Sequence, residues 1–126
     1  MTDYFRTVVT DVSDEARELV EGGILILFAE GAPPELAEVS VLHRVKMDPT
    51  VDSPTVGAEL QIGGVLTRIT AIGDYAWKKI GEIGHVVINF NGADSTPRPG
   101  EICASPVDAA SLNAALTPGA EILIRA

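Results

Sequence analysis

The chain has 126 residues, 46% of them hydrophobic but only 5% aromatic, so we expect one domain, residues 1–126, around an aliphatic core. A net charge of −9 argues against nucleic acid or an anionic membrane surface as partner. One cysteine and two histidines allow no intrachain disulfide and indicate no metal or cofactor site. The N-terminus lacks signal-peptide features and the longest apolar run, residues 24–29, cannot span a bilayer, so we expect a cytoplasmic protein without direct membrane insertion.

The first part of the chain predicts strands broken by glycine and proline. Residues 4–12, rich in Thr and Val, are expected to form a strand, and Ser13 to cap a short helix through residue 20. The continuous apolar run 24–29 indicates a central strand, and residues 35–38 add at most one helical turn. Residues 39–46 are expected to form a strand with Val39, Val41, His43 and Val45 on one face and Ser40, Leu42, Arg44 and Lys46 on the other.

The second part predicts further short strands. Two β-runs, 58–62 and 65–72, are joined by Gly63-Gly64, which indicates a hairpin. The other predicted elements are a helix at 74–80, capped by Asp74 and followed by Gly81, strands at 85–90, 101–104 and 120–125, and a helix at 109–116. Cys103 falls in an apolar stretch and is expected to be buried and unreactive. About seven short strands with few helices predict an all-β domain, a small barrel or sandwich, rather than a βαβ fold.

The two histidines are the candidate reactive groups. The chain has no P-loop, no dinucleotide-binding glycine motif, no H-E-x-x-H and no G-x-S-x-G. An imidazole can act as nucleophile, acid or base near neutral pH. However, His43 lies on the apolar face of its predicted strand, where a structural histidine is the more common finding, and Arg44 points the other way. His85 begins a strand and is equally consistent with a structural hydrogen bond, so the residue pattern leaves both roles open.

A longer motif favours chemistry at His43. The segment ILILFAEGAPPELAEVSVLH, residues 24–43, resembles the glucitol/sorbitol-specific enzyme IIA component of the bacterial phosphotransferase system (PTS), in which F-x-E-G-A-P-x-x-L-x-E precedes the active histidine. The matching residues are Phe28, Glu30, Gly31, Ala32, Pro33, Leu36 and Glu38, followed by His43. Similarity continues through ITAIGD at 69–74, IGHVVINFNG at 83–92 and the segment 116–122, whereas 44–54 and 96–106 match poorly.

The resemblance implies a phosphoryl carrier without a self-contained active site. The phosphocarrier protein HPr would donate its phosphoryl group to Nε2 of His43, and phospho-His43 would pass it to a cysteine of the IIB component, which works with the IIC membrane permease. Val39, Val41 and Val45 would form a hydrophobic rim that excludes water and docks both partners. His85 would support the reaction by donating a hydrogen bond to the phosphoryl oxygens.

Two alternatives stay open at this point. A regulatory or ligand-binding module could keep the IIA-like fold without passing phosphate to a sugar. A structural homo-oligomer is a third class, since short β-domains with exposed edges often pair. The sequence does not distinguish glucitol from another polyol as the transported substrate.

Overall fold

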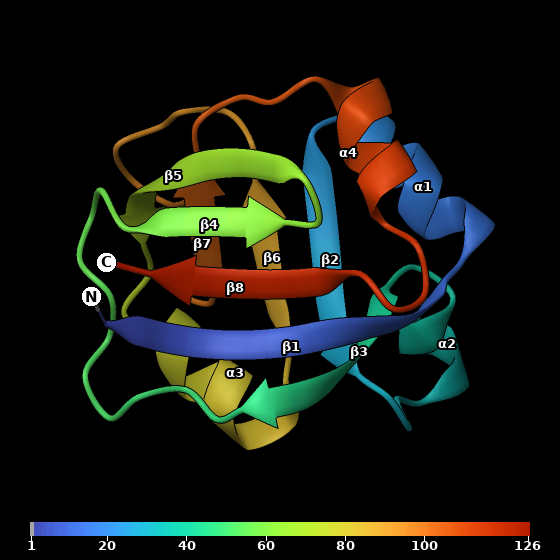
Figure 1. The fold of residues 1–126 in the computed structure, drawn as a ribbon, viewed down its shortest axis with the longest axis horizontal. Helices are drawn as coiled ribbons and strands as arrows, with labels where there is room; N and C mark the ends of the chain where they lie inside the picture. The colour runs from blue at the N-terminus through green and yellow to red at the C-terminus, as the bar shows by residue number, and fades with distance from the viewer. Residues whose placement is uncertain (1) are drawn as a thin grey trace.

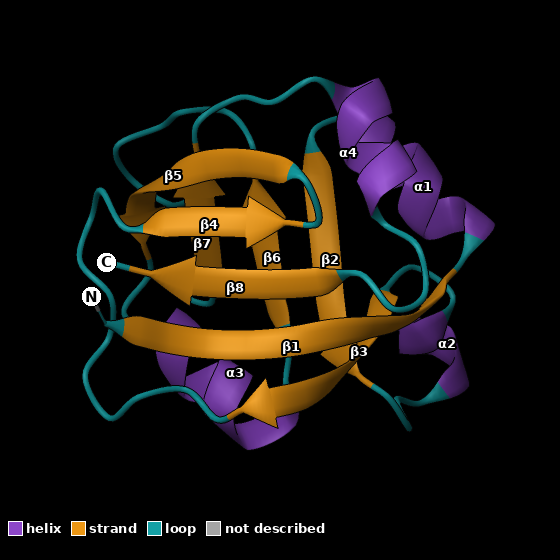
Figure 2. Ribbon diagram, viewed as in Figure 1, coloured by secondary structure: helices purple, strands orange, loops and turns teal. Residues whose placement is uncertain are grey.

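Residues 2–126, the part of the chain that the computed structural model describes, form eight strands and four short helices (Figures 1 and 2). The strands are β1 (Asp3–Val12), β2 (Ile24–Ala29), β3 (Val41–Met47), β4 (Glu59–Ile62), β5 (Val65–Ile72), β6 (Val86–Asn89), β7 (Glu101–Ala104) and β8 (Glu121–Arg125). The helices are α1 (Asp14–Glu21), α2 (Pro34–Ala37), α3 (Ala76–Ile83) and α4 (Ala109–Ala115). The mainly-β prediction is confirmed.

The strands close into a barrel in the order β1-β3-β2-β6-β7-β5-β4-β8. Most neighbours are antiparallel, but β2 pairs with β3, and β6 with β7, in parallel. In Figure 1, β4, β8 and β1 lie side by side in front, while β7, β6 and β2 run behind them. Closure pairs the long first strand on both edges, with β3 and β8, so β1 has no open edge.

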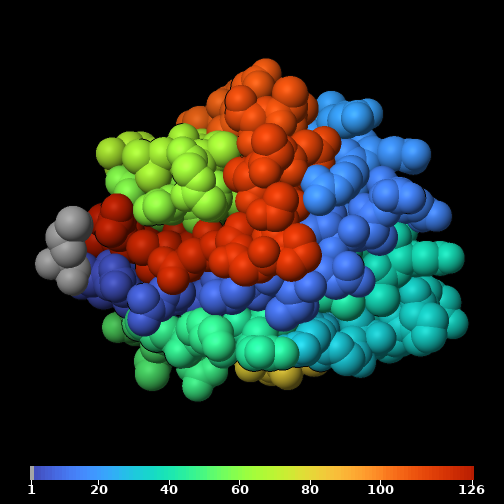
Figure 3. Space-filling model, turned by 45° about the vertical axis from the view of Figure 1, so that its right-hand side comes forward, coloured from blue at the N-terminus to red at the C-terminus, as the bar shows by residue number. Residues whose placement is uncertain are grey.

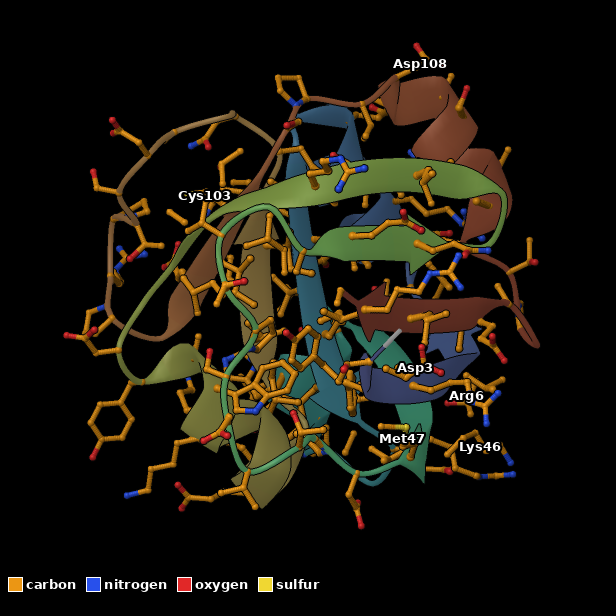
Figure 4. The ribbon with its side chains drawn as sticks, turned by 60° about the vertical axis from the view of Figure 1, so that its left-hand side comes forward. Asp3, Arg6, Lys46, Met47, Cys103 and Asp108 are labelled. Carbon is orange, nitrogen blue, oxygen red and sulfur yellow. The ribbon has the colours of Figure 1, made fainter. Side chains whose placement is uncertain are left out.

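Alternation along the strands fills the barrel with aliphatic side chains. On β1, Phe5, Thr7 and Val9 are buried, and the residues between them are exposed or half-buried. Cys103 on β7 is fully buried, as predicted, and burial raises the pKa of its thiol. Figure 4 shows it on the opposite side of the barrel from Lys46 and Met47, at the end of β3.

The helices cover the barrel from outside. Ser13 caps α1 as predicted, since its Oγ accepts a hydrogen bond from the Ala16 amide at 3.1 Å. α1 packs beside α4 at one end of the barrel (Figure 3), and the Arg17 guanidinium donates to the carbonyls of Asn113 and Leu116. On α3 the buried Trp77 donates from Nε1 to the Thr50 carbonyl at 2.7 Å.

Three predicted boundaries near the histidines are wrong. Helix α3 runs from Ala76 to Ile83, so Gly81 lies inside it and Asp74 does not cap it. Backbone contacts replace the expected cap, because the Tyr75 amide donates to the Pro99 carbonyl at 2.7 Å. β3 starts at Val41 rather than at residue 39, and His85 precedes β6 instead of opening it. His85 therefore occupies the junction between α3 and β6.

Candidate active site

His43 points into the barrel. It sits on β3 between β1 and β2, opposite Val9 on one side and Ala29 on the other. Only 1% of its surface is exposed. The Phe5 ring meets the imidazole edge-on, with 6.3 Å between ring centroids. His43 and Val41 share one face of this strand, as predicted, and that face places the His43 ring among core side chains.

Both ring nitrogens of His43 are hydrogen-bonded. Nε2 lies 2.6 Å from the Gly84 carbonyl oxygen, which can only accept, so Nε2 carries the proton. Nδ1 then accepts from the Thr7 hydroxyl, also at 2.6 Å. Burial lowers the pKa of His43, and the Gly84 carbonyl offsets part of that effect. The ring is therefore neutral, and neither nitrogen has a free lone pair.

The predicted hydrophobic rim around His43 is wrong. Val41 is completely buried, and Val45 packs against the core. Val39 precedes β3 and is only half-buried. Val41 and Val45 share with His43 the face of β3 that lies inside a closed barrel, and Val39 lies outside the strand, so the three valines do not form an exposed rim around His43. Arg44 points outward, as expected, and its guanidinium pairs with Glu30.

Gly84 connects the buried histidine to the surface one. It ends α3 in the left-handed conformation, with φ of 64°, and a Cβ at this position would lie 2.7 Å from the Ala29 Cβ. Only glycine fits such a site without strain. By holding the Gly84 carbonyl, His43 fixes the peptide that leads directly into His85.

The His85 ring lies outside the barrel. It packs on Phe28 of β2 with ring centroids 4.9 Å apart, and Nδ1 lies 3.0 Å from the Leu27 carbonyl oxygen. Nδ1 therefore carries the proton, and Nε2 of the neutral ring keeps a lone pair that meets no hydrogen-bond partner within residues 2–126. Burial lowers the pKa of His85, the Leu27 carbonyl raises it, and the nearby Lys79 ammonium lowers it. The two histidine rings face opposite sides of the sheet, so His85 does not contact the His43 ring.

His85 lines a surface cleft of about 450 Å³ between α3 and the segment before β7. The cleft is lined by Tyr75, Lys79, His85, Val87, Arg98, Pro99, Gly100 and Glu101. Arg98 is neutralised there, since its Nη1 donates to Glu101 Oε2 at 3.0 Å. Lys79 is half-buried and has no carboxylate within 4.0 Å among the residues that the structure describes. The cleft is thus lined by the His85 imidazole and by a lysine that has no carboxylate partner among residues 2–126.

Sequence reasoning overlooked the two basic residues of this cleft. Lys79 falls in the predicted helix at 74–80, and Arg98 lies in the segment 96–106, one of the two that match the family poorly. The IGH run at residues 83–85 was the available signal, because it joins a helix end to a histidine. Within residues 2–126 no cluster of three His, Cys, Asp or Glu side chains is arranged to hold a metal ion. None of the helices described has the length and apolarity to cross a membrane.

Comparison with known proteins places this chain in a family. The family described as PTS system glucitol/sorbitol-specific IIA component matches residues 4–122. Glucitol/sorbitol-specific EIIA components of Shigella flexneri and Escherichia coli K12 are each 31% identical over 108 residues, which cover 85% of this chain and 86% of theirs. A crystal structure of a PTS system IIA component from Enterococcus faecalis V583 shares the fold, with a TM-score of 0.71 and 21% identity over 96% of this chain and 99% of that one. The chain belongs to the family of glucitol/sorbitol-specific IIA components of the phosphotransferase system.

Proposed function

We propose that this chain carries a phosphoryl group from HPr to a cysteine of the IIB component, during uptake and phosphorylation of glucitol (sorbitol) or a related polyol. The observation that carries the proposal is that the chain belongs to a phosphotransferase family and that the family motif leads to His43. The partners follow from the family: HPr as donor, and the IIB and IIC components as acceptor and permease.

Phosphoryl transfer requires a histidine nitrogen that is accessible to the donor protein. The attacking nitrogen must be neutral while the other nitrogen keeps its proton, and the surroundings must stabilise charge on the transferred oxygens. Positioning supplies most of the rate, since phosphorus passes between two imidazoles of similar nucleophilicity. A surface imidazole with one nitrogen fixed by a backbone carbonyl meets these demands.

The assignment of the phosphoryl group to His43 stays a prediction. For Nε2 of His43 to attack, it has to release the Gly84 carbonyl and lose its proton, and the α3–β6 junction has to open far enough to admit the donor. His85 needs none of these changes. The carrier function holds in either case, because it requires only that one of the two histidines accept the group.

The test is phosphorylation of the purified chain by enzyme I, HPr and phosphoenolpyruvate, followed by intact mass. A gain of one acid-labile phosphoryl group is expected. Omission of HPr should abolish the gain, and a matching IIB component should then remove the group. If the chain gains nothing while HPr is itself phosphorylated, the carrier function is refuted and the IIA-like fold serves another purpose.

A further inference from the structure

We propose that Thr7 is a positioning residue for phosphoryl transfer at His43. Its hydroxyl stays hydrogen-bonded to Nδ1 while the ring changes tautomer, and it accepts the Nδ1 proton when Nε2 attacks phosphorus. This inference rests on the proposed function, with His43 as the residue that carries the group, as the family motif indicates. Thr7 lies on β1, outside that motif, and only the fold brings it to the ring.

Thr7 reaches His43 from the neighbouring strand. In the pairing of β1 with β3, Thr7 lies opposite Val45 and Val9 lies opposite His43, so Thr7 and His43 are diagonal neighbours on the inner face of the barrel. Thr7 Oγ1 and His43 Nδ1 are 2.6 Å apart. Because β1 is paired on both edges, with β3 and with β8, the strand ladders hold the hydroxyl in place against the ring.

The Thr7 hydroxyl serves His43 alone. The residue is completely buried, and a hydroxyl is costly in an apolar interior unless it is hydrogen-bonded. Its side chain makes one hydrogen bond within residues 2–126, the one to His43. A valine would fill the same space without burying a polar group. The polar atom at this position is therefore explained by the imidazole that it contacts.

The two hydrogen-bond partners of His43 differ in what they allow. The Gly84 carbonyl can only accept, so it keeps the proton on Nε2, which is the wrong tautomer for attack by that nitrogen. The Thr7 hydroxyl can donate or accept, because its hydrogen rotates and its oxygen has two lone pairs. When the α3–β6 junction opens and Nε2 is released, Thr7 changes from donor to acceptor. The ring thus keeps its orientation in both tautomers.

The transfer balances with water as the only further reactant. Nε2 of His43 loses its proton to water and Nδ1 takes one from water, so the ring stays neutral. The Nε2 lone pair then forms a bond to phosphorus as the P–N bond of the donor's phosphohistidine breaks, and that bonding pair returns to the donor ring. Nδ1 keeps its proton and donates it to Thr7 Oγ1. In the onward step a cysteine thiolate attacks phosphorus, and the Nε2–P bonding pair returns to the His43 ring.

This hydrogen bond is stronger in the transition state than in the resting chain. As Nε2 bonds to phosphorus, the ring gains positive charge, and the bond from Nδ1–H to Thr7 Oγ1 becomes charge-assisted. Only an interaction that strengthens in this way accelerates the chemical step. Loss of the hydroxyl should therefore slow phosphorylation beyond any effect that it has on stability.

Threonine variants test this role in the full chain, with phospho-HPr as donor and intact mass as the readout. Thr7→Val should slow phosphorylation about 5- to 30-fold, the difference between a neutral and a charge-assisted hydrogen bond, with the fold retained by circular dichroism. Thr7→Ser keeps the hydroxyl and should retain the wild-type rate. A wild-type rate for folded Thr7→Val, or a Thr7→Ser variant as slow as Thr7→Val, would overturn the inference.

Thr67 on β5 supplies the matched control. It is also buried, and its hydroxyl donates to the Ser105 carbonyl at 2.9 Å, away from His43. Thr67→Val therefore loses a buried hydrogen bond of similar strength without changing the ring, and should be phosphorylated at the wild-type rate. Equal slowing of Thr67→Val and Thr7→Val would show a general effect of core stability and contradict the positioning role.

¹⁵N NMR of the wild-type chain tests the same inference without any variant. Before phosphorylation we expect the His43 proton on Nε2. After phosphorylation we expect the group on Nε2 and, at neutral pH, a proton on Nδ1 that exchanges slowly with water because Thr7 holds it. An Nδ1 without a proton in phospho-His43, or a group on another residue, overturns the inference and leaves the carrier function intact. A wild-type chain that gains no group refutes the carrier function itself.

Discussion

Replacing Thr7 with valine removes one hydroxyl from the barrel interior and preserves the shape of the side chain. Thr7 is fully buried and its hydroxyl is the only donor to Nδ1 of His43 within residues 2–126, so water cannot take its place without entering the core. A buried acceptor left without a partner costs about 1–3 kcal/mol. For a domain of this size, each kcal/mol lowers the melting temperature by about 4 °C. We therefore expect Thr7→Val to lose about 1–3 kcal/mol of unfolding free energy.

Urea denaturation, followed by Trp77 fluorescence and far-ultraviolet circular dichroism, measures this loss. Thr10→Val is the matched control, because Thr10 lies on the same strand, is half-buried, and makes no side-chain hydrogen bond within residues 2–126. The control should change the unfolding free energy by less than about 0.5 kcal/mol. If Thr7→Val also leaves the free energy of unfolding unchanged, the Thr7 hydroxyl does not hold the His43 ring as the structure shows. The ring would then be free to turn toward a phosphoryl donor.

Three further predictions concern the histidines and their junction. Burial lowers the pKa of His43 and of His85, so below about pH 6.5 the unfolded chain binds protons that the folded chain excludes. The free energy of unfolding should therefore fall as the pH drops, by up to about 1.4 kcal/mol per pH unit for each histidine. Urea denaturation between pH 7.5 and 5 measures this dependence, and the unfolding free energy of His43→Gln should change less with pH. Lys79→Met should raise the pKa of His85, because the neighbouring ammonium disfavours the imidazolium. NMR titration of the His85 ring measures the shift. An unchanged pKa would mean that Lys79 lies too far from His85 to affect its protonation. Gly84→Ala should lower the free energy of unfolding by about 2 kcal/mol or more, because Gly84 has a positive φ and a Cβ there would lie 2.7 Å from the Ala29 Cβ. Gly81→Ala is the control, since Gly81 lies inside α3 with open space around it. It should raise the free energy of unfolding by about 0.5–1 kcal/mol in the same denaturation assay.

Local chemistry made much of the fold predictable. Strand alternation placed Val41 and His43 on one face, and the Gly63-Gly64 pair gave the β4–β5 hairpin. Strand alternation does not indicate whether an apolar face lies inside a closed barrel or lines an open groove. The predicted valine rim was wrong for this reason, since closure depends on pairings between distant strands such as β1 with β8.

The site was harder to predict because its contacts are long-range. His43 is hydrogen-bonded to the backbone carbonyl of Gly84, which lies 41 positions away in the sequence. A backbone carbonyl is present in every residue, so the sequence does not indicate which one a histidine will contact. The start of α3 was missed in the same way. Gly73 lies so close to the Pro99 carbonyl that a Cβ would be 2.3 Å from its oxygen, and this approach, rather than the Asp74 side chain, sets where the helix begins. Tertiary packing overrode a reasonable local signal.

Residues of the family motif contact both sides of the α3–β6 junction, next to the cleft. Phe28, the first residue of the F-x-E-G-A-P run, supports the His85 ring, and His43, the histidine that follows the motif, holds the Gly84 carbonyl. A motif that includes His43 therefore fits a positioning role as well as a reactive one, because either role ties the same residues to the same peptide. Membership of a motif does not by itself distinguish the two roles. Among the four histidine nitrogens of residues 2–126, both nitrogens of His43 and Nδ1 of His85 are hydrogen-bonded, so a reactive role for His43 requires that its contacts with Thr7 or Gly84 be exchanged.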